Sequence, residues 1–263
     1  MTTAHRARAT HSPGLDHGDH IAVLKFGSSV LACPRDYTRA AEVIAAEVAR
    51  GRKVVAVVSA MGETTDSLLS AARSVTPVPS DTMLGALLAT GEEASVALLS
   101  LALAARGVCA VGFNASRVPL RTSGALQDAD PVFVDAGQIR AAFRTRDAVV
   151  FPGFIGVDMT GVASLLGRGG SDLTALFLGD ALEAAEIRLI KDVDGIFPSD
   201  PRSGSAVQPF RELSWDRARE IGGGVVQPKA IDFAERRRLR FRVTGLRGEG
   251  TSIGARVGWP VLS

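Results

Sequence analysis

Apolar and polar positions divide this chain into short aliphatic runs and longer stretches in which apolar residues recur every three or four positions. The short runs predict buried β-strands, and the periodic stretches predict helices. The predicted strands are residues 21–26, 53–59, 108–113, 148–157 and 186–193. The predicted helices are residues 37–50, a helix capped by Thr64, Thr65 or Asp66, and two stretches within 83–107 that Thr90-Gly91-Glu92 separates.

Strands that alternate with helices predict an α/β fold whose mostly parallel sheet is covered on both faces. In such sheets, ligands bind beyond the carboxyl ends of the strands. Polar residues follow the predicted strands after residues 26, 58, 157 and 190, so we expect these loops to form a site. Residues 115–135 show little periodicity, and we expect a small hairpin there, over the site.

Composition narrows the class of protein. The chain has 263 residues, enough for one large α/β domain or two small lobes. A net charge of +2 gives no basis for a nucleic-acid partner, and Arg236–Arg238 is typical of a solvated helix face. Residues 1–19 are predicted to be a disordered tail, without the apolar stretch of a secretory signal. Because no apolar run reaches the roughly 18 residues of a membrane span and Cys33 and Cys109 are isolated, we expect a cytoplasmic protein with reduced thiols and no membrane partner.

The distribution of histidines restricts the chemistry. All four, His5, His11, His17 and His20, lie within the first 20 residues. Unless that segment folds back, the rest of the chain has no Ser–His–Asp triad, no histidine base and no histidine-bound metal. Chemistry there must use lysine, arginine, carboxylates and backbone amides.

Two glycine-rich loops carry the strongest signals. Lys25 precedes Gly27-Ser28-Ser29, where backbone amides and an ammonium suit a phosphate, although a strand-end lysine that reaches solvent fits the same pattern. The loop GRGGSD places Arg168 between glycines, where a guanidinium suits a carboxylate. Ser171 or Asp172 suits the helix start that follows. Neither a Walker motif nor a dinucleotide fingerprint follows any predicted strand.

Further candidates are weaker when each is taken alone. The loop 59–66, SAMGETTD, is either a ligand loop or a plain connection. KDVDGIFPSDPR provides Asp192 for ribose hydroxyls and Arg202 for a polyphosphate, or forms turns only. Glu92 suits a substrate ammonium or faces solvent at a helix end, and Lys229 lies in the first turn of a helix after another glycine loop.

Taken in order, these segments resemble the amino acid kinase family, most closely the catalytic domain of aspartate kinases. The resemblance covers roughly residues 20–257 and rests on the order of the motifs rather than on any single one. The motifs are KFG-S-S, VVSAMG-x-TTD, ATGE, GFIG, LGRGGSD, KDVDGIF-x-x-DPR, VVQPKA and a closing GEGTSIG.

The resemblance implies a three-layer αβα open sandwich with a central, mostly parallel sheet, an amino-acid lobe at about 20–165 and a nucleotide lobe at about 166–263. It implies transfer of the γ-phosphoryl group of ATP, which carries Mg²⁺, to the side-chain carboxylate of aspartate. That carboxylate is ionised at pH 7 and needs no base, which fits the lack of histidine. Lys25 and Asp172 would be catalytic, and a homodimer is the family habit. The amino acid would contact Ser59, Thr65, Glu92, Arg168 and Ser171. The nucleotide would contact Lys25, Gly27, Ser28, Ser29, Lys191, Asp192, Phe197, Arg202 and Lys229.

Departures from the family pattern bear on the substrate and the nucleotide. KFGSSVL is one residue shorter than the usual KFGGTSV and is more like glutamate 5-kinase. Lys191 stands where the family usually has threonine before Asp-Val-Asp-Gly, and Gly224 stands where G-A-K-V-L-H-P has its lysine. We also expect the protein to lack the regulatory ACT domains of many aspartate kinases, and therefore to lack feedback through them.

The leading hypothesis is an unregulated aspartate kinase that supplies a specialised pathway. One alternative is a kinase of glutamate, N-acetylglutamate or a related natural-product acid, which the short opening loop favours. The other is a non-catalytic nucleotide or amino-acid sensor, which Lys191 and Gly224 favour.

Overall fold

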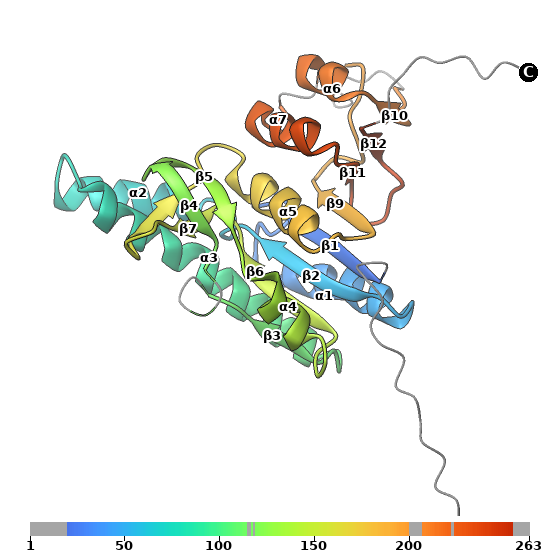
Figure 1. Cartoon of the computed structure of the whole chain (residues 1–263), viewed down its shortest axis with the longest axis horizontal. Coiled ribbons are helices and arrows are strands. Elements are labelled where there is room, and N and C mark those ends of the chain that lie inside the picture. Colours follow the sequence, from blue (N-terminus) through green and yellow to red (C-terminus); the bar gives the residue numbers. More distant parts are fainter. Residues whose placement is uncertain (1–19, 115–116, 118, 200–206, 222–223, 255–263) are drawn as a thin grey trace, which may run out of the picture.

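An eight-stranded sheet lies between two layers of helices, and a four-stranded sheet stands beside it (Figure 1). The computed structural model describes residues 20–114, 117, 119–199, 207–221 and 224–254, so the predicted tail at 1–19 lies outside the described residues. In spatial order the large sheet contains β10 (Glu212–Leu213), β12 (Thr251–Ile253), β11 (Phe241–Thr244), β9 (Glu186–Ile190), β1 (Ile21–Phe26), β2 (Lys53–Val58), β6 (Ala148–Pro152) and β3 (Ala110–Gly112). Among the described strands of this sheet, only β11 and β12 pair antiparallel, so the predicted αβα sandwich with a mostly parallel sheet is confirmed.

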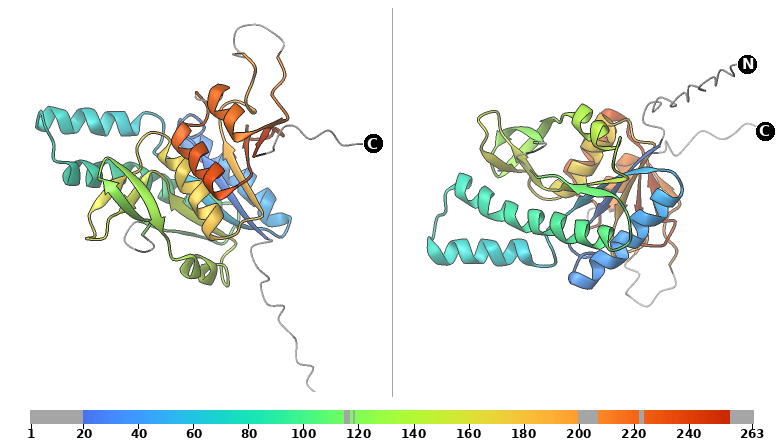
Figure 2. Two further views of the ribbon diagram at one scale, coloured as in Figure 1. Left: turned by 45° about the horizontal axis from the view of Figure 1, so that its top comes forward. Right: turned by 90° about the horizontal axis from the view of Figure 1, so that it is seen from below.

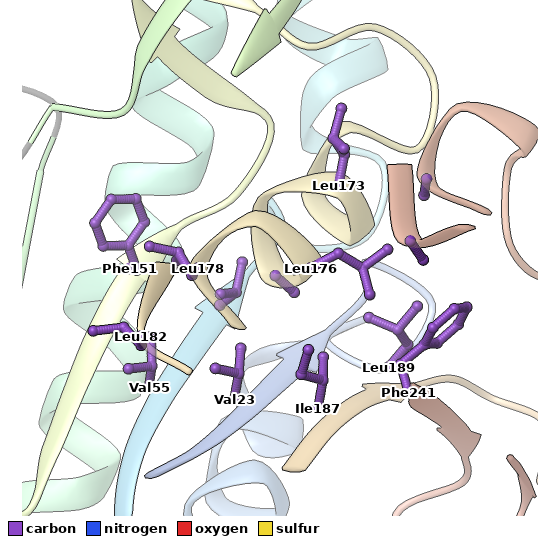
Figure 3. Close-up of a cluster of buried hydrophobic side chains, with 14 of the residues drawn as sticks. Val23, Val55, Phe151, Leu173, Leu176, Leu178, Leu182, Ile187, Leu189 and Phe241 are labelled. Carbon is purple, nitrogen blue, oxygen red and sulfur yellow. The ribbon is translucent and has the colours of Figure 1, made fainter. Parts of the chain in front are cut away.

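The two faces of the large sheet bury different helices because successive side chains of a strand point to opposite sides. Ala22, Leu24 and Phe26 of β1 pack against α1 (Pro34–Ala49) and α3 (Asp81–Ala104). Val23 packs beneath α5 (Gly170–Ala181), as Figure 3 shows with Leu176 above the strands. The face under α5 is completed by α4 (Ala136–Ala142), α6 (Trp215–Ile221) and α7 (Pro228–Arg237). Aromatic side chains are buried among the aliphatic ones on both faces, Phe26 and Tyr37 on the α1 face and Phe151 and Phe241 on the α5 face. Lys25, two residues after Val23, belongs to the α5 face.

The small sheet lies beside α3 and combines a hairpin with two short strands that follow β6 in the chain (Figure 2). Its order is β5 (Asp128–Phe133), β4 (Arg121–Ala125), β7 (Ile155–Val157) and β8 (Ala163–Leu165). The antiparallel β4–β5 pair confirms the hairpin predicted within 115–135. The prediction of one strand over 148–157 is wrong, because Phe154 adopts a φ of +66° and the chain leaves the large sheet after Pro152.

Helix α3 runs without interruption, which corrects the prediction of two stretches separated at Thr90-Gly91-Glu92. Gly91 serves packing rather than helix termination. A Cβ at Gly91 would lie 3.0 Å from Ala60 Cβ, so the missing side chain lets α3 approach the loop after β2. The tertiary contact outweighs the low helix propensity of one glycine.

Helix α3 is also the one described helix that is long and apolar enough to cross a membrane, with 24 residues and a mean hydropathy of 1.5. Because Glu92 and Glu93 interrupt it, α3 is not a continuous apolar run of the kind that the sequence analysis considered. In the fold α3 is a core helix, since Val96, Leu99 and Leu103 are buried against α1 and the sheet.

The start of α2 (Thr64–Val75) also differs from its prediction. The N-cap is Glu63, with no side-chain cap bond, so Thr64, Thr65 and Asp66 lie inside the first turn instead of capping it. The Thr64 hydroxyl instead donates to the carbonyl of Met61, 2.6 Å away.

Candidate active site

A buried ion pair lies at the carboxyl edge of the large sheet. Lys25 is next to last in β1 and points to the face that α5 covers, while Asp172 lies in the first turn of α5. Lys25 Nζ is 2.8 Å from Asp172 Oδ1, and the two side chains are 7% and 3% exposed. The sheet and the helix that packs on it therefore bring together two residues that are 147 positions apart in the sequence.

A second lysine completes the cluster. Lys191 directly follows β9, the neighbour of β1, and its Nζ donates to Asp172 Oδ2 at 2.7 Å. Burial lowers the pKa of Lys25 to about 8; Asp172 opposes that shift and Lys191 adds to it. Burial alone would raise the pKa of Asp172, but the two ammonium groups outweigh it and hold that pKa below its usual value. With both lysines protonated the cluster carries one net positive charge, which suits an anion.

The glycine loop before α5 sets the position of Asp172. Gly167 and Gly169 have φ values of +71° and +74°, a region that favours glycine, and Gly169 is the N-cap of the helix. The prediction that Ser171 or Asp172 caps α5 is therefore wrong. Because Asp172 lies inside the first turn, its carboxylate is available to the lysines.

A chain of hydroxyl groups supports the loop after β2. Tyr37 of α1 hydrogen-bonds Ser95 of α3 at 2.5 Å, and the Ser95 hydroxyl donates to the carbonyl of Ser59 at 2.6 Å. The Ser59 hydroxyl in turn donates to Ser171 Oγ at 3.0 Å. Helices α1 and α3, on one face of the large sheet, therefore hold Ser59 through its carbonyl, while its hydroxyl contacts α5 on the opposite face.

Glu92 is a buried carboxylate at the same edge. It is 2% exposed, and its Oε1 accepts from the backbone N–H of Ala60 at 3.3 Å. Among the described residues, its Oε2 has no hydrogen-bond partner. Burial raises the pKa of Glu92 to about 7, against the usual 4.5. This burial excludes the alternative that Glu92 faces solvent at a helix end.

A cavity of about 370 Å³ opens above these groups. All five residues predicted to contact the amino acid line it: Ser59, Thr65, Glu92, Arg168 and Ser171. The predicted catalytic residues Lys25 and Asp172 line it too, as does Ser28, which was predicted to contact the nucleotide. Arg168 is exposed at the rim, whereas Glu92 lies at the buried end. A cation and a carboxylate across one small cavity match the carboxylate and ammonium of an amino acid.

A second cavity of about 600 Å³ adjoins the first. Four residues predicted to contact the nucleotide line it: Ser29, Lys191, Asp192 and Phe197. Ser29 Oγ donates to Asp192 Oδ1 at 3.2 Å and so links the loops after β1 and β9. Three residues line both cavities: Lys191, Gly224 and Val225.

Two of the predicted nucleotide contacts line neither cavity, and a third lies outside the described residues. Lys229 lines neither cavity, because its Nζ contacts Asp128 at 2.6 Å and also bonds the carbonyls of Ala129 and Leu166, which ties the β4–β5 hairpin to the rest of the fold. Gly27 is buried beneath the ammonium of Lys25, and Arg202 lies outside the described residues.

Some residues of the site are not identified by the sequence analysis. Phe154 and Gln227 line the first cavity, and Tyr37 and Ser95 support it from behind. Phe154 lies in the motif GFIG. The glycine before it is the one sequence signal for its positive φ. No local pattern marks Tyr37 or Ser95, since each is an ordinary helix position.

This fold and this edge site together define the class of protein. The chain belongs to the amino acid kinase family, whose model matches residues 20–245. Aspartokinase from Geobacillus stearothermophilus is 37% identical over 218 residues, 82% of this chain and 54% of that protein. Aspartokinase 2 from Bacillus subtilis is 34% identical over 226 residues, 85% of this chain and 55% of that protein.

Solved structures agree with this assignment. The aspartate kinase from Synechocystis has a TM-score of 0.76 at 29% identity, over 92% of this chain and 40% of that one. Carbamate kinase from Giardia lamblia, with a TM-score of 0.65 at 15% identity over 89% of this chain and 98% of that one, shares the fold alone. The chain spans about half the length of the curated relatives it matches.

Proposed function

We propose that this protein transfers the γ-phosphoryl group of ATP to the side-chain carboxylate of aspartate. The observation that carries the proposal is the junction of two cavities at a Lys25–Asp172–Lys191 cluster, with Arg168 and Glu92 lining the cavity on one side. The aspartokinases at 34% and 37% identity support the choice of aspartate among acids.

Three groups would hold the amino acid. The Arg168 guanidinium at the rim suits the α-carboxylate, which a planar fork of donors binds in a bidentate manner. Glu92 Oε2, which has no partner among the described residues, suits the ammonium. Ser59 and Ser171 line the same cavity, and their linked hydroxyls suit the side-chain carboxylate.

The chemical step needs positioning and positive charge rather than a base. A carboxylate oxygen of aspartate forms a bond to the γ-phosphorus, and the bond from that phosphorus to the β,γ-bridging oxygen breaks. The bonding electrons leave with ADP, and no proton changes place in the transfer. Lys25, Lys191 and backbone amides at the glycine loops bring the two anions together and spread the transition-state charge.

Mg²⁺ would enter with the nucleotide. The second cavity offers the carboxylate of Asp192, a hard oxygen donor of the type that Mg²⁺ accepts while it keeps water and phosphate ligands. When bound, the ion neutralises phosphate charge. Asp192 would hold it from the protein side, with the nucleotide phosphates as its main ligands.

Assembly and location are proposed separately from the chemistry. We propose a cytoplasmic homodimer, the commonest symmetric assembly of soluble proteins. Exposed Met83 and Leu101 lie along the outer side of α3 and offer apolar area for such a contact. Sedimentation equilibrium that gives a monomer mass at micromolar concentration would contradict the dimer.

Trapping of the acyl phosphate tests the proposed reaction. The protein is incubated with ATP, Mg²⁺, hydroxylamine and one acid at a time: aspartate, glutamate or N-acetylglutamate. Aspartate should give hydroxamate and release ADP in equal amounts. Turnover with a different acid alone would replace aspartate as the substrate. Nucleotide binding by calorimetry without turnover of any acid would favour a sensor instead.

A further inference from the structure

Lys191 occupies the point where the two cavities meet. Ile190 pairs with Phe26 and Leu189 pairs with Lys25 across the parallel β1–β9 ladder. Side chains two positions apart in an extended segment share a face, so Lys191 lies on the same face as Leu189 and Lys25, beneath the start of α5. Its ammonium therefore approaches Asp172 from the nucleotide side, while Lys25 approaches from β1.

The shared carboxylate fixes the two ammonium groups at a defined separation. Each Asp172 oxygen contacts one of them, at 2.8 Å for Lys25 and 2.7 Å for Lys191. The Lys191 side chain is 13% exposed, and it lines both cavities. A structural ion pair would need only one lysine, because a single ammonium already neutralises Asp172. The second ammonium leaves a positive charge that faces the passage between nucleotide and acid.

The loop opposite this passage has room for a side chain. Gly224 lines both cavities with Lys191, and a Cβ placed on it would meet no described atom within 4 Å. Position 224 is where the family pattern has a lysine, and position 191 is where it has a threonine. Among the described residues, the second cation therefore lies on the strand side of the passage, and position 224 on the loop side is a glycine.

We propose that Lys191 is a catalytic residue that contacts the phosphoryl group in transfer, in place of a lysine at position 224. The proposal rests on the proposed kinase function. In the transfer described above, the Lys191 ammonium would bind a non-bridging γ-phosphoryl oxygen, and Lys25 would bind another from the opposite side of Asp172. Lys191 gains no covalent bond and loses no proton in the step.

Two lysine variants and one glycine variant test this assignment. Lys191→Thr restores the residue type usual in the family, and Lys191→Gln keeps the length of the side chain without its charge. Each should lower kcat about 100-fold, the usual cost of removing one group that stabilises transition-state charge. Adding Gly224→Lys to Lys191→Thr should recover at least about tenfold of that loss, because both positions border the same passage. Lys53→Thr, at the opposite end of the sheet, is the matched control and should leave kcat unchanged.

Binding gives a second readout that does not depend on turnover. In calorimetry without an acid, Lys191→Thr should weaken a non-hydrolysable ATP analogue about tenfold while ADP affinity changes less than about twofold, because ADP lacks the γ-phosphoryl group. Equal losses for both nucleotides would overturn the proposal, as would a kcat within threefold of the wild type. Failure of Gly224→Lys to recover activity would overturn the exchange of positions 191 and 224.

These outcomes separate the inference from the proposed function. If the wild type uses glutamate and not aspartate, the proposed substrate is wrong and the kcat comparison is made with glutamate. If the wild type turns over no acid, the proposed function is wrong and the ratio of analogue to ADP affinities alone decides the contact. Far-ultraviolet circular dichroism confirms that each variant is folded, and Lys25 still neutralises Asp172 in all of them.

Discussion

The buried carboxylate of Glu92 predicts a pH-dependent cost to the free protein. Burial raises its pKa from 4.5 to about 7, so the folded state favours the neutral acid. Below pH 4.5 Glu92 is protonated in both the folded and the unfolded chain, so its burial does not lower the free energy of unfolding through ionisation. As the pH rises from 4.5 to 7 the unfolded chain releases the proton first, and the folded protein loses stability. Above pH 7 the full loss is about 3 kcal/mol, since a tenfold change in an acid dissociation constant corresponds to about 1.4 kcal/mol.

The substitution Glu92→Gln removes this cost and keeps the acceptor for the Ala60 N–H. The difference in free energy of unfolding between variant and wild type should therefore increase by about 3 kcal/mol in favour of the variant from pH 4.5 to pH 8. Urea unfolding followed by circular dichroism at both pH values measures it. A difference that is the same at both pH values, or that falls as the pH rises, would refute the reasoning.

Glu92 should also control the affinity for aspartate. A rise in pH should strengthen aspartate binding, although it lowers the stability of the free protein. An ammonium binds the ionised carboxylate, and with a pKa of about 7 the ionised fraction of Glu92 rises about tenfold between pH 6 and pH 8. The KM for aspartate should therefore fall about tenfold over that range. In Glu92→Gln the KM should be higher and should no longer follow this pH dependence. A wild-type KM that is constant from pH 6 to pH 8 would remove Glu92 from the ammonium site.

Three further variants test other parts of the site. Lys25→Ala should lower kcat by about 100- to 1000-fold in the hydroxamate assay while the protein stays folded, because Lys191 still neutralises Asp172. Arg168→Ala should raise the KM for aspartate about 10- to 100-fold with little change in kcat, and unchanged kinetics would remove Arg168 from the site. Tyr37→Phe should lower the free energy of unfolding by about 1 kcal/mol through loss of the hydroxyl bond to Ser95, and a urea midpoint equal to the wild type would contradict it.

The sequence alone determined the sheet and the edge at which the site lies. Continuous aliphatic runs such as 21–26 and 53–59 have few alternatives to buried parallel strands, and β1 and β2 match them closely. Polar residues at the ends of these runs could be placed at one edge because all parallel strands end there. The order of the motifs then indicated the family, and Gly167–Asp172, predicted as part of the site, line the first cavity.

Only the tertiary structure decided how the groups at that edge act on one another. Helix α3 continues through Gly91, where the missing side chain allows close contact with Ala60. No local helix propensity encodes that contact. Asp172 is a partner of two lysines rather than a cap, because strand register places Lys25 and Lys191 on one face under α5. Lys229, equally basic in the sequence, forms an ion pair with Asp128 and lines neither cavity. Charge and spacing are local properties, whereas the partner of each charge depends on which segments the fold brings within about 3 Å.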